Sequence, residues 1–444
     1  MKKNKLIIFV VLSSILLSAC SLLTPKESEP FDPLDPHAKL VDGYVYTYSD
    51  VTGEATFYGL NGNANEEPIA KYTILSEYEG HPVTRLWRGA LAGARIDEVV
   101  VPNTVKYIDD GALAGKFRKI DLSEGILELG NSALPDSWYI RETVEEVLPE
   151  YTVPSSVKKV GMYAFGYTLN PQSVPSSLEE MAEQAFVKTH FGDVIIPEGV
   201  TTIPFCAFSG VRANSIVIPD SVTTIGKSAF EVAEQVTSIH IGSGVKVIPE
   251  RCFTSISKPD GFEGRYSLTV TGGESVEEIQ DEAFNNCYLQ YYPFSNVLKK
   301  IGKKALNAVI NRDFPDTLYE IGEDALAKGG VTPVADTPNA HVPSSLRSYP
   351  DYIFRYSIFD ETTVTLDATT YGTASFACTN LVEINMTHRL VRFKDEAFYG
   401  CRSLTNINYD GTKEEFQNAI KYNFDVFSNT PDVTVQCKDG VLIF

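Results

Sequence analysis

The sequence has few of the residues on which small secreted scaffolds and common enzyme sites depend. It contains 7 cysteines and 6 histidines among 444 residues. This cysteine density is far below that of small domains stapled by disulfides, and no pair has the CxxC spacing typical of zinc sites. No HExxH motif, GxSxG motif or phosphate-binding glycine loop occurs. We therefore expect a protein that is not an enzyme and that has no cofactor, no metal and no catalytic residues.

Basic charge is also scarce. The chain has 38 Lys and Arg against 58 Asp and Glu, a formal net charge of -20. Such a surface repels nucleic acid and anionic lipid and would attract basic partners, but it is equally typical of a soluble extracellular protein. Beyond the N-terminal segment, no stretch approaches the roughly 20 apolar residues of a membrane-spanning helix. We therefore expect no nucleic-acid partner and no second membrane segment.

The N-terminus predicts export and a lipid anchor. Three lysines precede an apolar run over residues 6–17, which has the length and flanks of a signal peptide. The run ends in Leu17-Ser18-Ala19-Cys20, which resembles the lipobox of bacterial lipoproteins. That resemblance implies lipidation of Cys20, and two acyl chains suffice for stable anchoring. The expected location is the extracellular side of the bacterial cell membrane; the alternative is an ordinary secretory signal with an incidental cysteine.

A thirteen-residue phrase recurs along most of the chain. It reads apolar-Pro-x-x-apolar-x-x-apolar-x-x-x-Ala-Phe and is clearest in IPDSVTTIGKSAF, residues 218–230. Ten of the thirteen steps between closing residues are 20 to 23 residues long, and the others are 28 or 31. This period predicts a leucine-rich-repeat solenoid of about 14 repeats. The closing Phe or Leu falls at Leu91, Leu113, Leu134, Phe165, Phe186, Phe208, Phe230, Phe253, Phe284, Leu306, Leu326, Phe354, Phe376 and Phe398.

The spacing within one repeat indicates how a coil folds. Ile239 and Ile241 alternate with polar residues, which predicts a short strand with one buried face. Gly226 is expected to permit a bend, and Phe230 is expected to fill the gap left by the neighbouring coil. Because no coil buries its apolar face alone, stability comes from neighbouring coils and the ends need caps. The strand spacing predicts a stack about 65 Å long.

The repeat phrase resembles a known family. VPSSVxxIGxxAFxxC is similar to the BspA-like leucine-rich repeats of bacterial and protist surface proteins, and AFNNC (283–287), SFACTNLVEI (375–384) and AFYGCRSLTNI (397–407) keep its fuller form. The resemblance covers roughly residues 70–410. It implies a right-handed α/β solenoid with short strands and turns, placed at a cell surface and associated with attachment. The ends of the chain resemble the β-rich entry segment and the exit segment of such proteins.

These features predict five regions. They are a lipoprotein signal peptide (1–19), a flexible tether (20–39), an N-terminal β cap (40–75), the repeats (76–409) and a C-terminal cap (410–444). In the last region, an apolar stripe predicts a helix over residues 413–420. Apolar runs on both sides of Asp439-Gly440 predict a hairpin.

The cysteines and one polar loop leave structural alternatives open. We expect Cys206, Cys252, Cys287, Cys378 and Cys401 to be core residues, because each lies on or just after the repeat turn. Cys378 and Cys401 are one coil apart, so a single disulfide between them is the alternative. The loop NGNANEE (61–67) has the alternating oxygen ligands of a weak calcium site, but the pattern also suits a polar loop between two strands.

The remaining candidates for function lie on the surface. Alternation predicts a polar ribbon on the open strand face, with Ser267 and Thr269 continuing the series after Ser238 and His240. Aromatic residues in and near the insertions would be contact anchors. The candidate ligand-binding residues are Trp138, Tyr139, Ser238, His240, Tyr288, Tyr291, Tyr292, Asn385 and Asn408.

Two classes of function remain open at the sequence level. The first is a lipid-anchored adhesion or binding protein that recognises a protein or glycan ligand through the solenoid surface and its inserted loops. The second is a structural or accessory envelope lipoprotein with an endogenous bacterial partner. An enzyme with an unrecognised site is a third, less favoured class. The residues that the repeat fixes are the buried ones, so the repeats do not identify the ligand.

Overall fold

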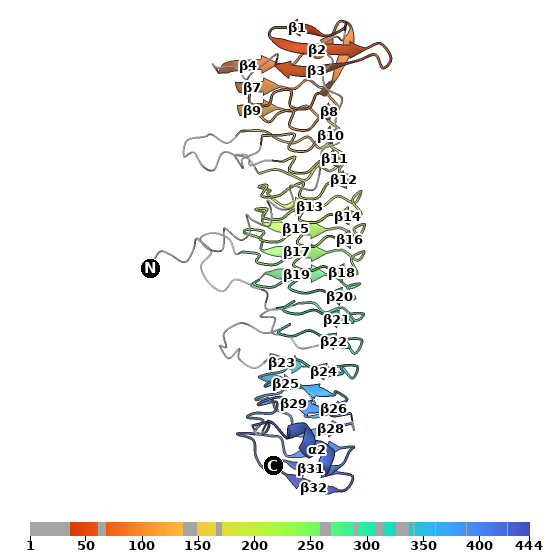
Figure 1. Ribbon diagram of the computed structural model, residues 1–444, viewed down its shortest axis with the longest axis vertical. Helices are drawn as coiled ribbons and strands as arrows, with labels where there is room; N and C mark the ends of the chain where they lie inside the picture. The colour runs from red at the N-terminus through yellow and green to blue at the C-terminus, as the bar shows by residue number, and fades with distance from the viewer. Residues whose placement is uncertain are drawn as a thin grey trace, which may run out of the picture.

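The chain forms one elongated stack of coils, with β1 at one end and β32 at the other (Figure 1). The computed structural model describes residues 36–60, 68–135, 149–165, 171–257, 268–287, 289, 292–306, 314–325, 337–340, 342–359, 361–387, 389–423 and 425–444. Cys20, Trp138, Tyr139, Tyr288, Tyr291 and the 61–67 loop lie outside these residues. Within them, no helix has both the length and the apolar composition to cross a membrane.

One side of the stack is a series of parallel strands that we call the long-strand ladder. In β15 and β17, buried and exposed side chains alternate along the strand, as the sequence predicted. Its members are β4 (Ile69–Thr73), β7 (Arg95–Val100), β9 (Lys116–Asp121), β13 (Val194–Ile195), β15 (Ser215–Ile218), β17 (Ser238–Ile241), β19 (Thr269–Gly272), β26 (Thr363–Leu366), β28 (Glu383–Met386), β30 (Asn406–Tyr409) and β31 (Thr434–Cys437).

A second side carries the short-strand ladder, formed later in each repeat. Its strands are mostly two residues long, with the second residue of the pair buried. In the middle of the stack the two ladders run side by side (Figure 1). The members are β6 (His81–Leu86), β8 (Tyr107–Ile108), β10 (Glu128–Leu129), β11 (Lys159–Val160), β12 (Glu180–Met181), β14 (Thr202–Ile203), β16 (Thr224–Ile225), β18 (Val247–Ile248), β20 (Glu278–Ile279), β21 (Lys300–Ile301), β22 (Glu320–Ile321), β24 (Ser348–Tyr349), β27 (Thr370–Tyr371) and β29 (Arg392–Phe393).

Antiparallel strands and one helix occupy the two ends. At the first end, β1 (Lys39–Val41), β2 (Tyr44–Ser49) and β3 (Glu54–Leu60) are antiparallel neighbours, and β3 joins β6. β5 (Glu77–Tyr78) also pairs with β6 in antiparallel fashion. Away from the ends, β23 (Thr337–Ala340) pairs in parallel with β25 (Ser357–Phe359). At the other end lie α2 (Lys413–Ile420) and a hairpin of β31 and β32 (Gly440–Ile443). The helix and hairpin occupy the residues that the sequence predicted for them.

The third side of each coil, the turn side, has an unusual backbone. The residue two positions before each closing Phe or Leu has a positive φ, for example +52° at Cys206 and +58° at Ser228. Residues other than glycine rarely adopt this left-handed conformation. Here it turns backbone N–H groups toward the next coil, where Cys206 N donates to Lys227 O at 3.2 Å and Phe208 N to Ala229 O at 2.8 Å. The hydrogen bonds between coils offset the conformational cost.

The core is a column of closing residues between the ladders and the turns. Phe186, Phe208 and Phe230 are each fully buried, and their rings stack at 4.7 and 5.3 Å between centroids. The chain turns directly after Gly226, as expected, but Gly226 has no positive φ, so the turn itself does not require glycine. A Cβ at Gly226 would lie 2.4 Å from the backbone nitrogen of Phe205, and the close approach of the two coils excludes a side chain.

Candidate functional site

The middle of the long-strand ladder presents two rows of outward side chains. Strand register aligns Asp193, Ser215, Ser238 and Thr269 in one row and Ile195, Val217, His240 and Thr271 in the other. The residues between them point inward and are buried. The outward rows therefore form a surface, the central strand face, whose positions are set by the parallel backbone rather than by flexible loops.

Side chains on the central strand face contact one another across the coils. The Ser215 hydroxyl donates to Asp193 Oδ1 at 2.6 Å, and His240 Nδ1 lies 3.1 Å from Thr271 Oγ1. Ile195 is 57% exposed and supplies an apolar position within the polar rows. Thr269 is exposed, as predicted, and it pairs with Ser238, while Thr271 pairs with His240. Ser267, the other residue predicted to continue the series, lies outside the described residues.

A second outward surface lies near the end of the ladder. Thr365, Asn385, Asn408 and Gln436 are aligned across β26, β28, β30 and β31 and form what we call the amide row. Asn408 Nδ2 donates to Asn385 Oδ1 at 2.9 Å and to Glu383 Oε1 at 2.6 Å. The row lines a hollow of about 490 Å³. This hollow was not predicted, although Asn385 and Asn408 were candidates.

The structure does not bring all predicted site residues together. Ser238 and His240 lie on β17, whereas Asn385 and Asn408 lie on β28 and β30 in a different sheet of the ladder. Tyr292 was predicted to be an exposed contact anchor, and this prediction is wrong because the residue is only 2% exposed. Its ring lies 5.5 Å from those of Phe284 and Phe294, and burial raises the pKa of its hydroxyl above the ordinary range. Tyr292 therefore fills the core between two coils.

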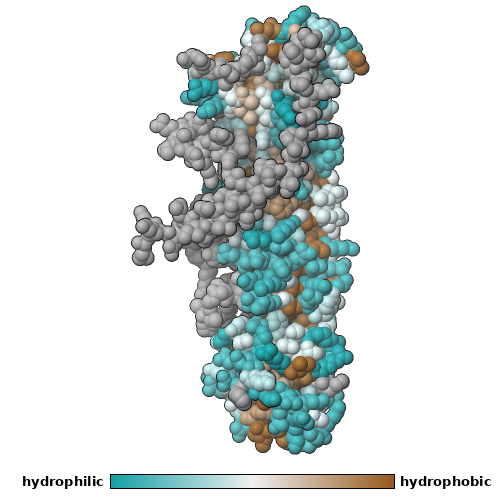
Figure 2. Space-filling model, in the orientation of Figure 1, coloured by the Kyte–Doolittle hydropathy of each residue, from teal (hydrophilic) through white to brown (hydrophobic). Residues whose placement is uncertain are grey.

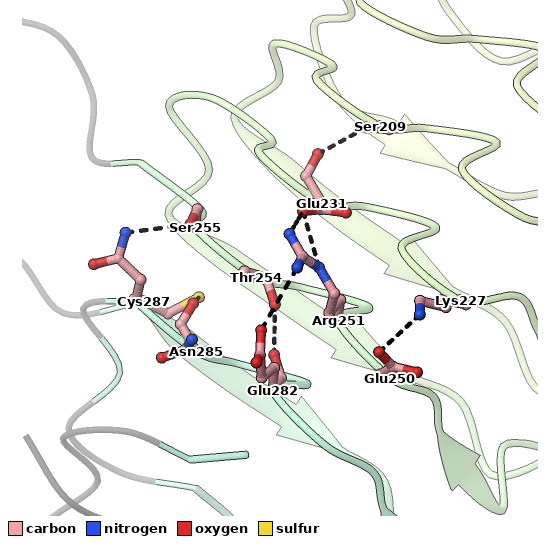
Figure 3. Close-up of polar contacts among 11 residues, drawn as sticks. Ser209, Lys227, Glu231, Glu250, Arg251, Thr254, Ser255, Glu282, Asn285 and Cys287 are labelled. Atoms are coloured by element: carbon pink, nitrogen blue, oxygen red, sulfur yellow. Dashed lines mark hydrogen bonds and ion pairs between the residues drawn. The ribbon is translucent and has the colours of Figure 1, made fainter. Parts of the chain in front are cut away.

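The turn side carries a charged network that the sequence did not predict. Figure 3 shows Arg251 between the carboxylates of Glu231 and Glu282, which come from the preceding and following coils. Arg251 Nε donates to Glu231 Oε1 at 3.2 Å, and this hydrogen bond raises the pKa of the guanidinium. The Glu231 side chain is 12% exposed. Because the charges satisfy one another, this network joins three coils and is not a favourable ligand site.

The six cysteines among the described residues are free thiols, so the alternative of a Cys378–Cys401 disulfide is wrong. Cys252, Cys287 and Cys401 are buried, as expected, whereas Cys206 and Cys378 are only partly buried. Cys287 Sγ donates to Phe253 O at 2.8 Å and Cys401 Sγ to Phe376 O at 3.0 Å. A small side chain with a weak donor fits here because it satisfies a carbonyl of the preceding coil.

Another hollow, of about 510 Å³, lies on the short-strand ladder near β8, β10, β11 and β12. Its lining includes Trp87, Arg88 and Asp109, and Arg88 Nη2 donates to Asp110 Oδ2 at 2.8 Å. Burial raises the pKa of the Asp109 carboxyl, although the adjacent Arg85 guanidinium opposes this shift. No group of three or more metal-ligating side chains occurs in the part of the chain that the structure describes.

The repeats match a family model described as the BspA type leucine-rich repeat region. The matches cover residues 145–260, 258–335 and 310–426, which together make up more than half of the chain. The chain belongs to the BspA-type leucine-rich repeat family. No curated protein matches it.

Solved structures with similar coils come from several bacteria. A leucine-rich repeat protein from Bacteroides ovatus is 18% identical, with 88% of this chain and 99% of the other covered at a TM-score of 0.40. A leucine-rich cell surface protein from Faecalibacterium prausnitzii is 18% identical, covering 91% and 96% at 0.33. The pneumococcal vaccine antigen PcpA is 15% identical, covering 88% and 98% at 0.36.

Proposed function

We propose that this chain is a surface-displayed binding protein, anchored by lipid on Cys20, that recognises a protein or glycan through its outward strand face and inserted loops. The central strand face is the observation that carries this proposal. Its two rows combine hydroxyls, a carboxylate and His240 with the exposed Ile195. A mixed surface with an apolar position inside a polar field suits a macromolecular ligand.

The rigidity of the central strand face supports a binding function rather than a purely structural one. Parallel strands fix its side chains at about 4.8 Å intervals along the stack. Contacts such as Ser215 to Asp193 already hold the side chains in place, so less conformational entropy is lost when a partner binds. Resemblance to surface proteins of this family points in the same direction.

A binding screen with a matched pair of variants tests the proposal. The acyl-free chain, residues 21–444, would be presented to immobilised matrix proteins, mucins and a glycan array. The double variant Ser238→Ala/His240→Ala should weaken binding to the recognised surface by about tenfold or more, as expected when contact residues are removed. Thr223→Ala/Thr224→Ala removes two exposed side chains from the short-strand ladder and should leave binding unchanged.

The opposite results would contradict this assignment. The contact surface would lie elsewhere if Thr223→Ala/Thr224→Ala weakened binding and Ser238→Ala/His240→Ala did not. If the chain bound none of these surfaces but captured a component of its own envelope, the accessory-lipoprotein alternative would replace adhesion.

The lipid anchor is tested separately. Cys20→Ala removes the thiol to which the diacylglyceryl group would be attached, so the protein should move from the membrane fraction to the medium or accumulate as precursor. Fractionation and intact-mass measurement distinguish these forms. A cleaved Cys20→Ala protein that stays in the membrane would show that another feature anchors it.

A further inference from the structure

The hollow at the amide row is distinct from the central strand face. Its volume of about 490 Å³ lies within the roughly 300–1,000 Å³ range of small-molecule sites. Its floor is made of side chains from four adjacent strands, held in register by the parallel backbone. The shape of the hollow is therefore fixed by the fold.

The amide row offers donors and acceptors side by side. Asn408 uses its amide nitrogen to contact Asn385 and Glu383, and this fixes the orientation of both amides. The Asn385 nitrogen and the Asn408 oxygen remain as donor and acceptor, with the Gln436 amide and the Thr365 hydroxyl on either side. Sugar hydroxyl groups both donate and accept, so neighbouring hydroxyls match such a row.

The electrostatics of the hollow favour an uncharged ligand. The charged residues of its lining are Asp410 and Lys438, and their side chains pair at 2.7 Å. A strongly anionic or cationic ligand would gain little there. Tyr409 and Met386 add apolar atoms to the lining. Such atoms suit the C–H faces of a sugar ring.

Tyr409 lies beneath the hollow on the inward face of β30. Tyr409 is 3% exposed, and its hydroxyl is buried with no hydrogen-bond partner among the described residues. Burial, with the nearby Glu415 carboxylate, raises the pKa of this hydroxyl to about 12, so it is neutral at physiological pH. A buried hydroxyl without a partner is costly. The ring lies on the inward face of β30, 5.4 Å from the ring of Phe416, so this hydroxyl belongs to the core beneath the hollow and makes no contact with a ligand on the amide row.

We infer that the hollow at the amide row is a subsite for a neutral carbohydrate. This inference rests on the proposed binding function and names a ligand class and a place for it. An extended peptide is less well matched, since peptides pair with sheet edges through their backbones, whereas this floor is a sheet face built of side chains. The expected recognition is through hydroxyl pairs lying across Asn385 and Asn408.

Defined neutral oligosaccharides provide the test. The intact acyl-free chain would be titrated with hexasaccharides of glucose, mannose, galactose and N-acetylglucosamine, and with sialylated and sulfated glycans for comparison. At least one neutral oligosaccharide should bind, and Asn385→Ala should weaken it about tenfold, the effect of losing one well-made hydrogen bond. Thr365→Val keeps the side-chain shape but removes the hydroxyl and should also weaken binding.

Asn406→Ala is the matched control. Asn406 is on the same strand as Asn408, is exposed and lies outside the lining of the hollow, so its removal should leave affinity unchanged. Thermal unfolding of each variant identifies any loss of fold. Failure of all neutral oligosaccharides to bind, or binding that is insensitive to both Asn385→Ala and Thr365→Val, would overturn the inference. The proposed function would survive that result if the central strand face still bound a partner.

Discussion

The phenylalanine that closes a repeat contacts its counterpart in each neighbouring coil. From Phe165 to Phe284, successive ring centroids are 4.7 to 5.3 Å apart. Each ring fills space between coils, and a neighbouring alanine leaves room for it. This column of rings therefore couples each coil from Phe165 to Phe284 to the next one.

Phe230→Ala should cost about 3–5 kcal/mol of local stability, since it leaves a cavity where a fully buried ring was. Solenoid stability is a nearest-neighbour property, so hydrogen exchange should speed up mainly between residues 208 and 253. Phe205→Ala is the control, because Phe205 is 38% exposed and its loss should have a small effect. Uniform loosening of the whole chain would count against the repeat packing.

The thiols provide a second prediction at this scale. Burial raises the pKa of Cys206 and of Cys287 to about 12, so little reactive thiolate is present at pH 8. Alkylation of the native protein should be slow at both positions and at the buried Cys252. Mass spectrometry after unfolding without reductant should find Cys378 and Cys401 as separate alkylated thiols. A linked Cys378–Cys401 peptide would contradict the packing described here.

The sequence predicted which residues are buried but not the backbone of the turns. The Ala-Phe spacing identified the core because burial needs apolar side chains at fixed intervals. The left-handed positions carry residues as different as Gln184, Arg251 and Glu282, so no glycine signal marks them. Hydrogen bonding between coils determines this conformation, and a single repeat read in isolation does not contain it.

At the scale of elements, the C-terminal segment, residues 410–444, forms one more coil into which helix α2 is inserted. Phe427 stacks on Phe398 at 5.8 Å with nearly parallel rings, and Phe398 N donates to Val426 O at 2.9 Å. The repeat pattern does not identify Phe427, because this residue follows Phe398 by 29 residues and lacks the preceding alanine. The helix itself was predictable from its apolar stripe, and its Thr412–Glu415 capping box defines where it begins.

Truncation after Asp410 should expose the last full coil. Phe393, Phe398 and Ile407 are fully buried in the intact chain, and the removed segment includes Phe416 and Phe427, which contact this core. The truncated protein should be less soluble and more sensitive to protease. Deletion of residues 21–33 is the control and should have little effect. Equal solubility and protease resistance of the truncated and intact proteins would make the segment a separate appendage.

A smaller change tests the helix without removing the coil. Thr412→Ala removes the side chain that accepts a hydrogen bond from Glu415 N at 3.2 Å. Loss of such a cap should reduce stability by about 1 kcal/mol, which chemical denaturation can measure. Thr430→Ala offers a threonine outside the helix as a comparison. A Thr412→Ala protein with unchanged stability would show that tertiary packing alone holds the helix.

At the scale of the whole molecule, carboxylates that link coils should make stability depend on pH. Hydrogen bonds from Ser243 lower the pKa of Asp220, and Lys299 lowers that of Glu277. Stability from such groups is present above the unfolded-state pKa of about 4 and is lost as pH falls through the folded-state value. The melting temperature should therefore decrease once the pH is lower than about 4. A melting temperature that stays unchanged down to pH 3 would contradict this.

The architecture of the whole molecule was predictable because the period of the repeat determines it. The ligand surfaces were only partly predictable. Alternation placed Ser238 and His240 outward, but the hollow at the amide row depends on strands from four coils and on Tyr409, which no single repeat reveals. The Tyr292 prediction was wrong because an aromatic side chain in an irregular coil serves the core as readily as the surface.

Footprinting of the bound protein tests the central claim most directly. Hydroxyl-radical labelling of the acyl-free chain would be compared with and without the immobilised mucin, matrix protein or glycan that it binds. We predict protection of outward residues on the long-strand ladder, including His240 and its neighbours on β15 and β17. Turn-side residues around Arg251 should stay equally reactive. Protection confined to the turn side, with the strand face unchanged, would contradict the account.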